Sequence, residues 1–494
     1  MFLLIVAFVF AGRYKLVTGL ISSMGTPALK TEERINWWTV IRDAIRGSRH
    51  DYTSGPIGRA VVLLAIPMVL EMCMESVFAV CDVFFVSRLG PNATATVGLT
   101  ESMMTLVYTV AIGLSIGVAA VVARRIGEKR PDAAAEAAVQ GIALGLGVAA
   151  LVAALGVTLA PKLLALMGAE PAVRAMGSSY TRVMLSGSAT VLLLFLINAI
   201  FRGAGDAAIA MRVLWLANAI NILLGPCLIF GLGPFPRLGV TGAAVATTIG
   251  RGTGVLYQLY RLARGDATLT VRRVHLALHP AVMAHLLELS GSGTFQVLVG
   301  TASYIGLVRI LSTFGSAAVA GYTIAIRLVV FWILPSWGLS NAAATMVGQS
   351  LGARDPQRAE RAVWIAAGYD MAIMGVVGFI FIAFASPIVG LFTRDAQAAA
   401  VGAQALRTMS YGFIFYALGM VVTQSFNGAG DTWTPTWINL FCFWMIEIPL
   451  AYFLAHVLGL GPFGVFVSIT IGYSLLALVA TFLFRRGRWK LRMV

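Results

Sequence analysis

Charged residues are scarce in this sequence. Asp, Glu, Lys and Arg make up only 12% of the 494 residues, whereas hydrophobic residues make up 59% and the mean hydropathy is +0.86. A soluble chain of this length would cover its cores with roughly 25% charged residues. Because that surface charge is missing, the composition excludes a water-soluble globular protein and indicates that lipid surrounds the chain.

Cysteine and the motifs of catalysis are also nearly absent. The four cysteines, at positions 73, 81, 227 and 442, lie singly within apolar runs and form no C-x-x-C pair, so they are interpreted as packing residues rather than disulfides or metal ligands. No histidine/carboxylate cluster, nucleophile elbow or Walker loop is found. These absences argue against a membrane enzyme and an ATP-driven pump, and we predict neither enzymatic activity nor a cofactor or metal.

Long apolar runs are abundant. Runs of about 20 residues, the length that crosses the hydrocarbon core of a bilayer, recur from Ala60 to Phe484. Only helices and closed barrels satisfy the backbone in lipid, and runs that are continuously apolar rather than alternating select helices. The predicted fold is therefore all-α and polytopic, with about twelve transmembrane helices.

The basic residues, which bring the net charge to +15, are unevenly placed. If the N-terminus is cytosolic, the even-numbered connections between spans and the C-terminal tail carry most of them, among them Arg124, Arg125, Lys129, Arg130, Arg261, Arg264, Arg354, Arg358, Arg485, Arg486, Arg488 and Arg492. This is the positive-inside pattern. It predicts a multi-pass membrane protein with both termini in the cytosol, and it leaves no need for a nucleic-acid partner.

An internal repeat organises the chain. The segment from Phe201 to Asp206 recurs 225 positions later from Phe426 to Asp431, and Gly113-Leu114-Ser115 recurs at the same shift. Each half holds about six spans, so both enter the membrane in the same orientation, as in carriers that work by alternating access. We predict a cytosolic N-terminal segment (1–58), two six-helix bundles (59–262 and 283–485), a cytosolic linker (263–282) and a basic tail (486–494).

Several short motifs point to a family. They are Ala65-Ile66-Pro67, Val80-Cys81-Asp82, Arg88-Leu89-Gly90, the Arg-Gly-x-Gly-Asp turn at Arg202, Asn218-x-x-Asn221-Ile222 with Pro226, and Gly242 to Thr247. In this order, and duplicated, they resemble the multidrug and toxic compound extrusion (MATE) transporters after Pro56. The resemblance implies a V-shaped twelve-helix carrier of the cell inner (cytoplasmic) membrane. It would expel small organic, usually cationic, compounds in exchange for protons or sodium ions. We expect it to act as a monomer in membrane lipid.

Three carboxylates lie within the first span. At roughly 100° per residue, Glu71, Glu75 and Asp82 share one helix face. Charged groups inside a span are expensive and mark functional sites by default. Like charges in a low-dielectric site cannot all stay ionised, so the face could load a proton outside, release it inside, and attract a cationic substrate in between.

The resemblance adds further cation-coupling residues. Asp82 matches the family's first-span aspartate, Asn221 matches an asparagine of the fifth span, and Thr247 matches a threonine of the sixth. The family's further aspartate before the proline is Gly225 here. Because hard cations want several oxygen ligands, this departure favours proton coupling, with sodium as the alternative.

The second half offers a candidate substrate or second cation site at Gln296, Asn341, Asp370 and Glu447. Gln296 stands 225 positions beyond Glu71, so the repeat keeps a polar group and loses the charge. Asp370 and Glu447 could bind a cation or pair with an arginine, and Arg251 is among the expected intramembrane partners. A flippase for a lipid-linked precursor is the alternative function, although a pyrophosphate cargo would favour Arg and Lys over acids.

Overall fold

The computed structural model describes residues 37–47, 50–265 and 268–492, and these are helical with no strand among them. Residues 1–36, which include most of the predicted cytosolic segment, lie outside the described residues. The first described helix is α3 (Trp37–Arg46). It buries Val40 and Ala44 and leaves Trp38 exposed, as expected for an amphipathic surface helix.

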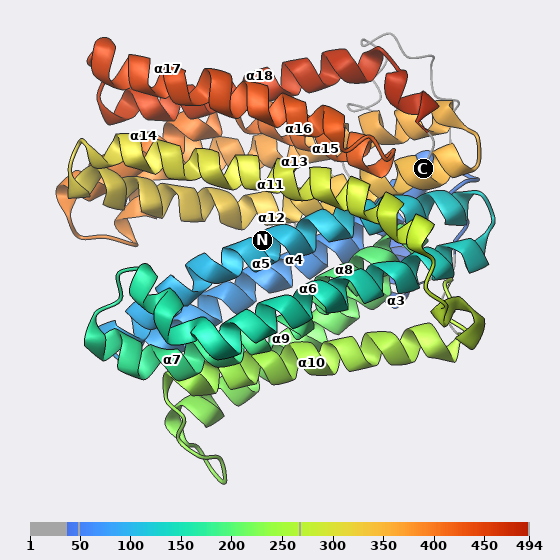
Figure 1. Cartoon of the computed structure of the whole chain (residues 1–494). Coiled ribbons are helices and arrows are strands. Elements are labelled where there is room, and N and C mark those ends of the chain that lie inside the picture. Colours follow the sequence, from blue (N-terminus) through green and yellow to red (C-terminus); the bar gives the residue numbers. More distant parts are fainter. Residues whose placement is uncertain (1–36, 48–49, 266–267, 493–494) are drawn as a thin grey trace. The chain divides into compact units, whose positions relative to one another are not determined.

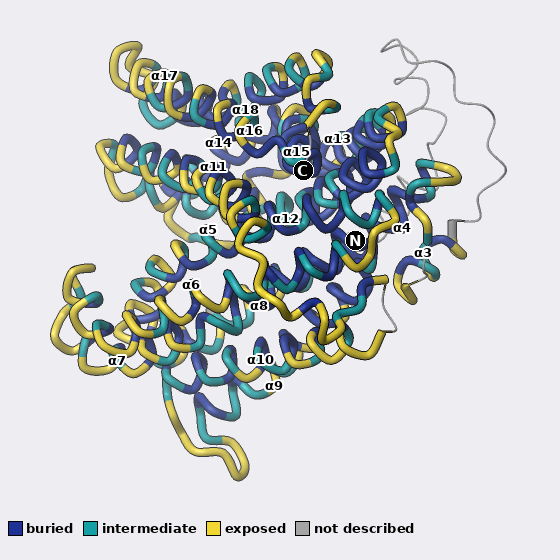
Figure 2. Tube along the Cα trace, turned by 45° about the vertical axis from the view of Figure 1, so that its right-hand side comes forward, coloured by how far each residue is buried: buried dark blue, intermediate teal, exposed yellow. Residues whose placement is uncertain are grey.

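The helices form two compact units, here called the N-unit (residues 70–294) and the C-unit (residues up to 69 and 295–494). The N-unit takes the second part of α4 (Ile57–Ser87), the first part of α11 (Pro280–Ser312), the short η1 (Arg273–Leu276), and all of α5 (Pro91–Gly127), α6 (Pro131–Leu166), α7 (Pro171–Ser186), α8 (Ser188–Ala204), α9 (Ala207–Phe230) and α10 (Val240–Arg264) (Figure 1). Residues 232–238, between α9 and α10, are exposed (Figure 2).

The C-unit repeats this order. It contains the remaining parts of α4 and α11, then α12 (Ser316–Gly352), α13 (Pro356–Gly390), α14 (Ala396–Ser410), α15 (Phe413–Gly428), α16 (Trp433–Asn439), the π-helix η2 (Leu440–Glu447), α17 (Ile448–Tyr452), the π-helix η3 (Phe453–Val457), α18 (Pro462–Arg485) and η4 (Arg488–Leu491). The two units divide α4 and α11 within their length, and the predicted domain boundaries at 58, 262, 282 and 485 stay a prediction.

Ten helices among the described residues are long and apolar enough to cross a membrane, and the bent pair α14–α15 makes an eleventh. The remaining long helix, α10, has 25 residues but carries Arg251, Arg261 and Arg264. These arginines lower its hydropathy, and counting α10 as a span gives the predicted twelve. The chain is thus an all-α multi-pass membrane protein.

The backbone repeats as the sequence does. Among the described residues, only Lys129 (φ 60°) and Arg354 (φ 59°) have positive φ without being glycine, and they stand 225 positions apart. Both follow a long helix and precede the Arg/Asp-Pro step that begins the next one, where proline is favoured in the first turn. Gly90 (φ 98°) and Gly315 (φ 96°) show the same correspondence.

Close helix packing is repeated as well. Within the N-unit, Gly203 of α8 lies against the backbone of Ala119 in α5, and a Cβ there would stand 2.8 Å from its carbonyl oxygen. Within the C-unit, Gly428 of α15 lies in the same way against Ala344 of α12. Small residues allow such close backbone approach between membrane helices. The repeated motif ending in Gly-Asp therefore specifies packing at this position.

We expect Gly428→Ala to destabilise the protein by about 1–3 kcal/mol, because overpacked backbone cannot move aside as a flexible side chain can. The matched control is Gly300→Ala in α11, where a Cβ meets nothing within 4 Å. That change should be neutral or stabilising by roughly 0.5–1 kcal/mol, since alanine favours the helix. Thermal unfolding in detergent measures both, and equal melting temperatures for the two variants would contradict the packing argument.

Candidate coupling and substrate sites

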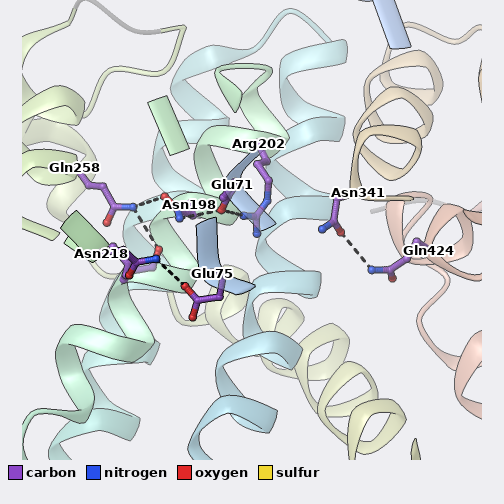
Figure 3. Close-up of polar contacts among 9 residues, drawn as sticks. Glu71, Glu75, Asn198, Arg202, Asn218, Gln258, Asn341 and Gln424 are labelled. Carbon is purple, nitrogen blue, oxygen red and sulfur yellow. Dashed lines mark hydrogen bonds and ion pairs between the residues drawn. The ribbon is translucent and has the colours of Figure 1, made fainter. Parts of the chain in front are cut away.

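Glu71 lies at the centre of a buried polar cluster in the N-unit. Its side chain is 1% exposed, and Oε1 accepts hydrogen bonds from Nη1 of Arg202 (2.6 Å) and Nδ2 of Asn198 (3.0 Å) (Figure 3). Asn198 and Arg202 are four residues apart on α8, so they share one helix face. Asn198 in turn accepts a hydrogen bond from Gln258 of α10. Glu71 is therefore compensated by a guanidinium and fixed by an amide network.

Glu75, one turn further along α4, has a different set of partners. Nδ2 of Asn218 donates to its Oε2 (3.2 Å), and Nη2 of Arg251 approaches its Oε1 at 3.4 Å. Arg251 is 3% exposed and also donates to the hydroxyl of Tyr108 (2.8 Å). Arg251, which the sequence offered as a partner for Asp370 or Glu447, thus pairs with Glu75 instead.

Asp82 differs from both glutamates. It is partly exposed, and in the part of the chain that the structure describes it makes no hydrogen bond or ion pair. The eleven helical steps from Glu71 to Asp82 place them roughly 16 Å apart along the helix. Of the three acids on this face, Asp82 alone has no counterion in contact.

Asn221 and Thr247 contact each other rather than Asp82. Nδ2 of Asn221 donates to Oγ1 of Thr247 (2.7 Å), which joins α9 to α10. No hydrogen bond joins either residue to Asp82. A Cβ at Gly225 would meet nothing within 4 Å, so open space stands where the family resemblance expects an aspartate. The described residues also contain no group of three or more His, Cys, Asp or Glu that could hold a metal ion.

In the C-unit, amides replace the Glu71–Arg202 pair. The positions 225 residues beyond Glu71 and Arg202 are Gln296 and Asn427. Gln296 is 8% exposed and its Oε1 has no partner among the described residues. Asn427 donates to Gln424, which donates to Oδ1 of Asn341 (3.2 Å) (Figure 3). The acid and the base have been lost together, so neither charge is left buried alone.

Asp370 and Glu447 are the buried acids of the C-unit. Asp370 is fully buried in α13, where Oγ of Ser336 donates to its Oδ2 (2.6 Å) and its Oδ1 has no partner within the described chain. Glu447 is 2% exposed and lies against Gly472 of α18. Neither pairs with an arginine in the described residues, so the expected ion pair is not found. Such carboxyls are costly to ionise and are suited to bind a cation or a proton.

Comparison with known proteins decides the family. The MatE family model matches residues 67–227 and 294–453, once in each repeat. The chain belongs to the MatE family. Each of the two matches covers one copy of the internal repeat found in the sequence.

Curated relatives of this MatE chain align with most of its length. It is 24% identical to the "Probable multidrug resistance protein YoeA" of Bacillus subtilis over 443 residues, covering 89% of this chain and 95% of the relative. It is 25% identical to the "FAD transporter" of Shewanella oneidensis, covering 89% and 96%. The solved "Crystal structure of MATE in the straight conformation" matches with a TM-score of 0.83 and 28% identity, covering 89% and 97%.

The sequence patterns do not identify the partners of the first-span acids. They place Arg202 only in a turn, and they give no signal for Asn198, Gln258 or Tyr108. One signal was available: Arg202 is charged where its repeat counterpart, Asn427, is neutral, and Glu71 is charged where Gln296 is neutral. Paired loss of opposite charges between repeats indicates a contact.

Proposed function

We propose that this MatE transporter is a secondary active antiporter that exports small organic compounds, chiefly cations, in exchange for protons. It would act by alternating access, as a monomer, in the cytoplasmic membrane with both termini in the cytosol. The names of the Bacillus relative and of the "Probable multidrug resistance protein NorM" of Thermotoga maritima support multidrug efflux.

The observation that carries the proposal is the difference among the three acids of α4. Glu71 is held by Arg202, and Glu75 is approached by Arg251. Asp82 has no contacting counterion within the described structure. Asp82 is therefore the proposed proton-binding residue. Glu75 is the neighbouring acid of the same face and pairs with Arg251, whereas Glu71, held by Arg202, is proposed to have a structural role.

A proton needs one carboxyl, whereas sodium needs a cage of oxygen ligands. Nδ2 of Asn221 donates a hydrogen bond to Oγ1 of Thr247, and Gly225 supplies no side-chain oxygen. These features favour protons over sodium. In the C-unit, Asp370 and Glu447 are proposed to hold the cationic substrate or a second cation, and Gln296 and Asn341 provide uncharged polar contacts.

The test uses purified protein in liposomes loaded with a fluorescent organic cation. An inward proton gradient and an inward sodium gradient are applied separately. We expect the proton gradient alone to drive efflux. Efflux driven by sodium would shift the coupling site to Asn221 and Thr247. Absence of cation efflux under both gradients would contradict the drug-antiport proposal and make the flippase of a lipid-linked precursor the next function to test.

The open space at Gly225 allows a sharper test of ion choice. We expect Gly225→Asp to introduce a carboxylate beside Pro226 without a steric clash, because no atom lies within 4 Å of the added Cβ. The extra charged oxygen ligands should make efflux respond to sodium. Gly225→Asn is the matched control of similar size and no charge. If both variants remain indifferent to sodium, the missing aspartate does not explain ion choice.

A further inference from the structure

A pocket of ≈ 330 Å³ lies in the C-unit where α18 ends. One wall is apolar and is formed by Trp437, Phe441, Val479 and Leu483, which come from α16, η2 and α18. The lining also includes two arginines, Arg486 and Arg488, just after α18. The pocket thus combines apolar side chains, here called the apolar wall, with two arginines.

The two arginines differ from the other cations of the tail. Lys490 pairs with Glu360, and Arg492 pairs with Asp431 at 3.2 Å. Arg486 and Arg488 are exposed and, among the residues that the structure describes, contact no carboxylate. The one acid that lines the pocket, Asp431, is already occupied by Arg492 and by the hydroxyl of Thr434 (2.7 Å). The pocket therefore presents uncompensated positive charge.

The apolar wall is exposed as well as aromatic. Trp437 is 60% exposed and Phe441 is 41% exposed. Trp433 stacks on Trp437, with ring centroids 6.3 Å apart. Tryptophans at helix ends are typical of the membrane–water interface, where lipid headgroups lie. The positive-inside pattern places this end of α18 at the cytosolic face, where anionic lipids attract nearby arginines.

We propose that this pocket binds an anionic phospholipid, with its phosphate on Arg486 and Arg488 and one acyl chain along Trp437, Phe441 and Val479. An organic cation would be repelled by the two arginines. A free phosphate would leave the exposed aromatic wall without a partner. Guanidinium groups bind phosphate through paired hydrogen bonds, and an acyl chain covers apolar surface that water would otherwise contact.

The test uses the purified full-length chain and native mass spectrometry with two lipids of identical chains, dioleoyl phosphatidylglycerol and dioleoyl phosphatidylcholine. We expect the anionic lipid to bind more tightly to the wild type. The double variant Arg486→Gln/Arg488→Gln should weaken phosphatidylglycerol binding roughly 30-fold, from the usual contribution of an arginine near an anionic lipid surface. Phosphatidylcholine binding should change little.

The matched control is Arg354→Gln/Arg361→Gln, which removes two exposed cations of the same unit that do not line the pocket. It should keep the wild-type affinity. Val479→Phe, which fills the apolar side and leaves both arginines, should also weaken lipid binding; its melting temperature confirms that it is folded. Wild-type affinity in the Arg486/Arg488 variant, or equal binding of the two lipids, overturns the proposal. Displacement of phosphatidylglycerol by millimolar inorganic phosphate would indicate a small-anion site instead.

Discussion

Asp82→Asn protein is expected to fold normally and to lose proton-driven efflux. Asparagine keeps the size of the side chain and removes the group that takes up the proton. Because Asp82 makes no ion pair among the described residues, its loss leaves no cation uncompensated. The acceleration of efflux by a proton gradient should disappear, a change on the order of the 5–150-fold couplings seen between linked sites. Efflux from proteoliposomes with and without the gradient measures it.

Two controls separate coupling from folding for this variant. Asp82→Glu keeps a titratable carboxyl and should retain part of the proton-driven efflux. Substrate counterflow without any ion gradient should persist in Asp82→Asn, since the substrate site is proposed to lie elsewhere. Proton-driven efflux at the wild-type rate in Asp82→Asn would refute the assignment of the proton to this residue.

Glu71→Gln is expected to act on stability. The change leaves Arg202, which is 12% exposed, without the carboxylate that contacts it at 2.6 Å. Removing one partner of a buried ion pair typically costs about 3–5 kcal/mol, because the remaining charge is uncompensated. Thermal unfolding in detergent should show a clear fall in the melting temperature. A stable Glu71→Gln protein that has lost proton-driven efflux would instead make Glu71 a coupling residue.

The repeat supplies the matched control. Its second copy carries Gln296 and Asn427 at the positions of Glu71 and Arg202. The double variant Glu71→Gln/Arg202→Asn reproduces that uncharged pair in the N-unit. Because residues in contact are not additive, the double variant should be more stable than Glu71→Gln alone. If the two losses simply add, Glu71 and Arg202 do not stabilise each other.

Much of the fold could be predicted because its signals are local. The apolar runs predict the spans. The glycine and proline breaks predict where the spans end, since α5 begins at Pro91 and α13 at Pro356. The repeat shift of 225 reappears in the backbone angles of Lys129 and Arg354. The sequence does not predict the division of α4 and α11 between the two units, because the hydropathy of a helix does not tell which other helices it contacts.

The candidate sites show the same limit. Helical periodicity predicts correctly that Glu71 and Glu75 face one side of α4, since both bond to neighbouring N-unit helices. It could not tell that one would meet Arg202 and the other Arg251. It also left open whether Asp370 would pair with an arginine, and the structure shows it bonded to Ser336 instead.

By itself, the sequence determined that lipid surrounds the chain, that it is an all-α multi-pass protein, that it is duplicated, and which family it resembles. Each of these follows from properties of short segments: hydropathy over about 20 residues, turn chemistry, and motifs in a fixed register. Only the tertiary structure decided which acids are compensated. Glu71 meets Asn198 across 127 positions, and Glu75 meets Arg251 across 176. The partner of a buried charge depends on how distant helices pack, and one helix does not carry that information.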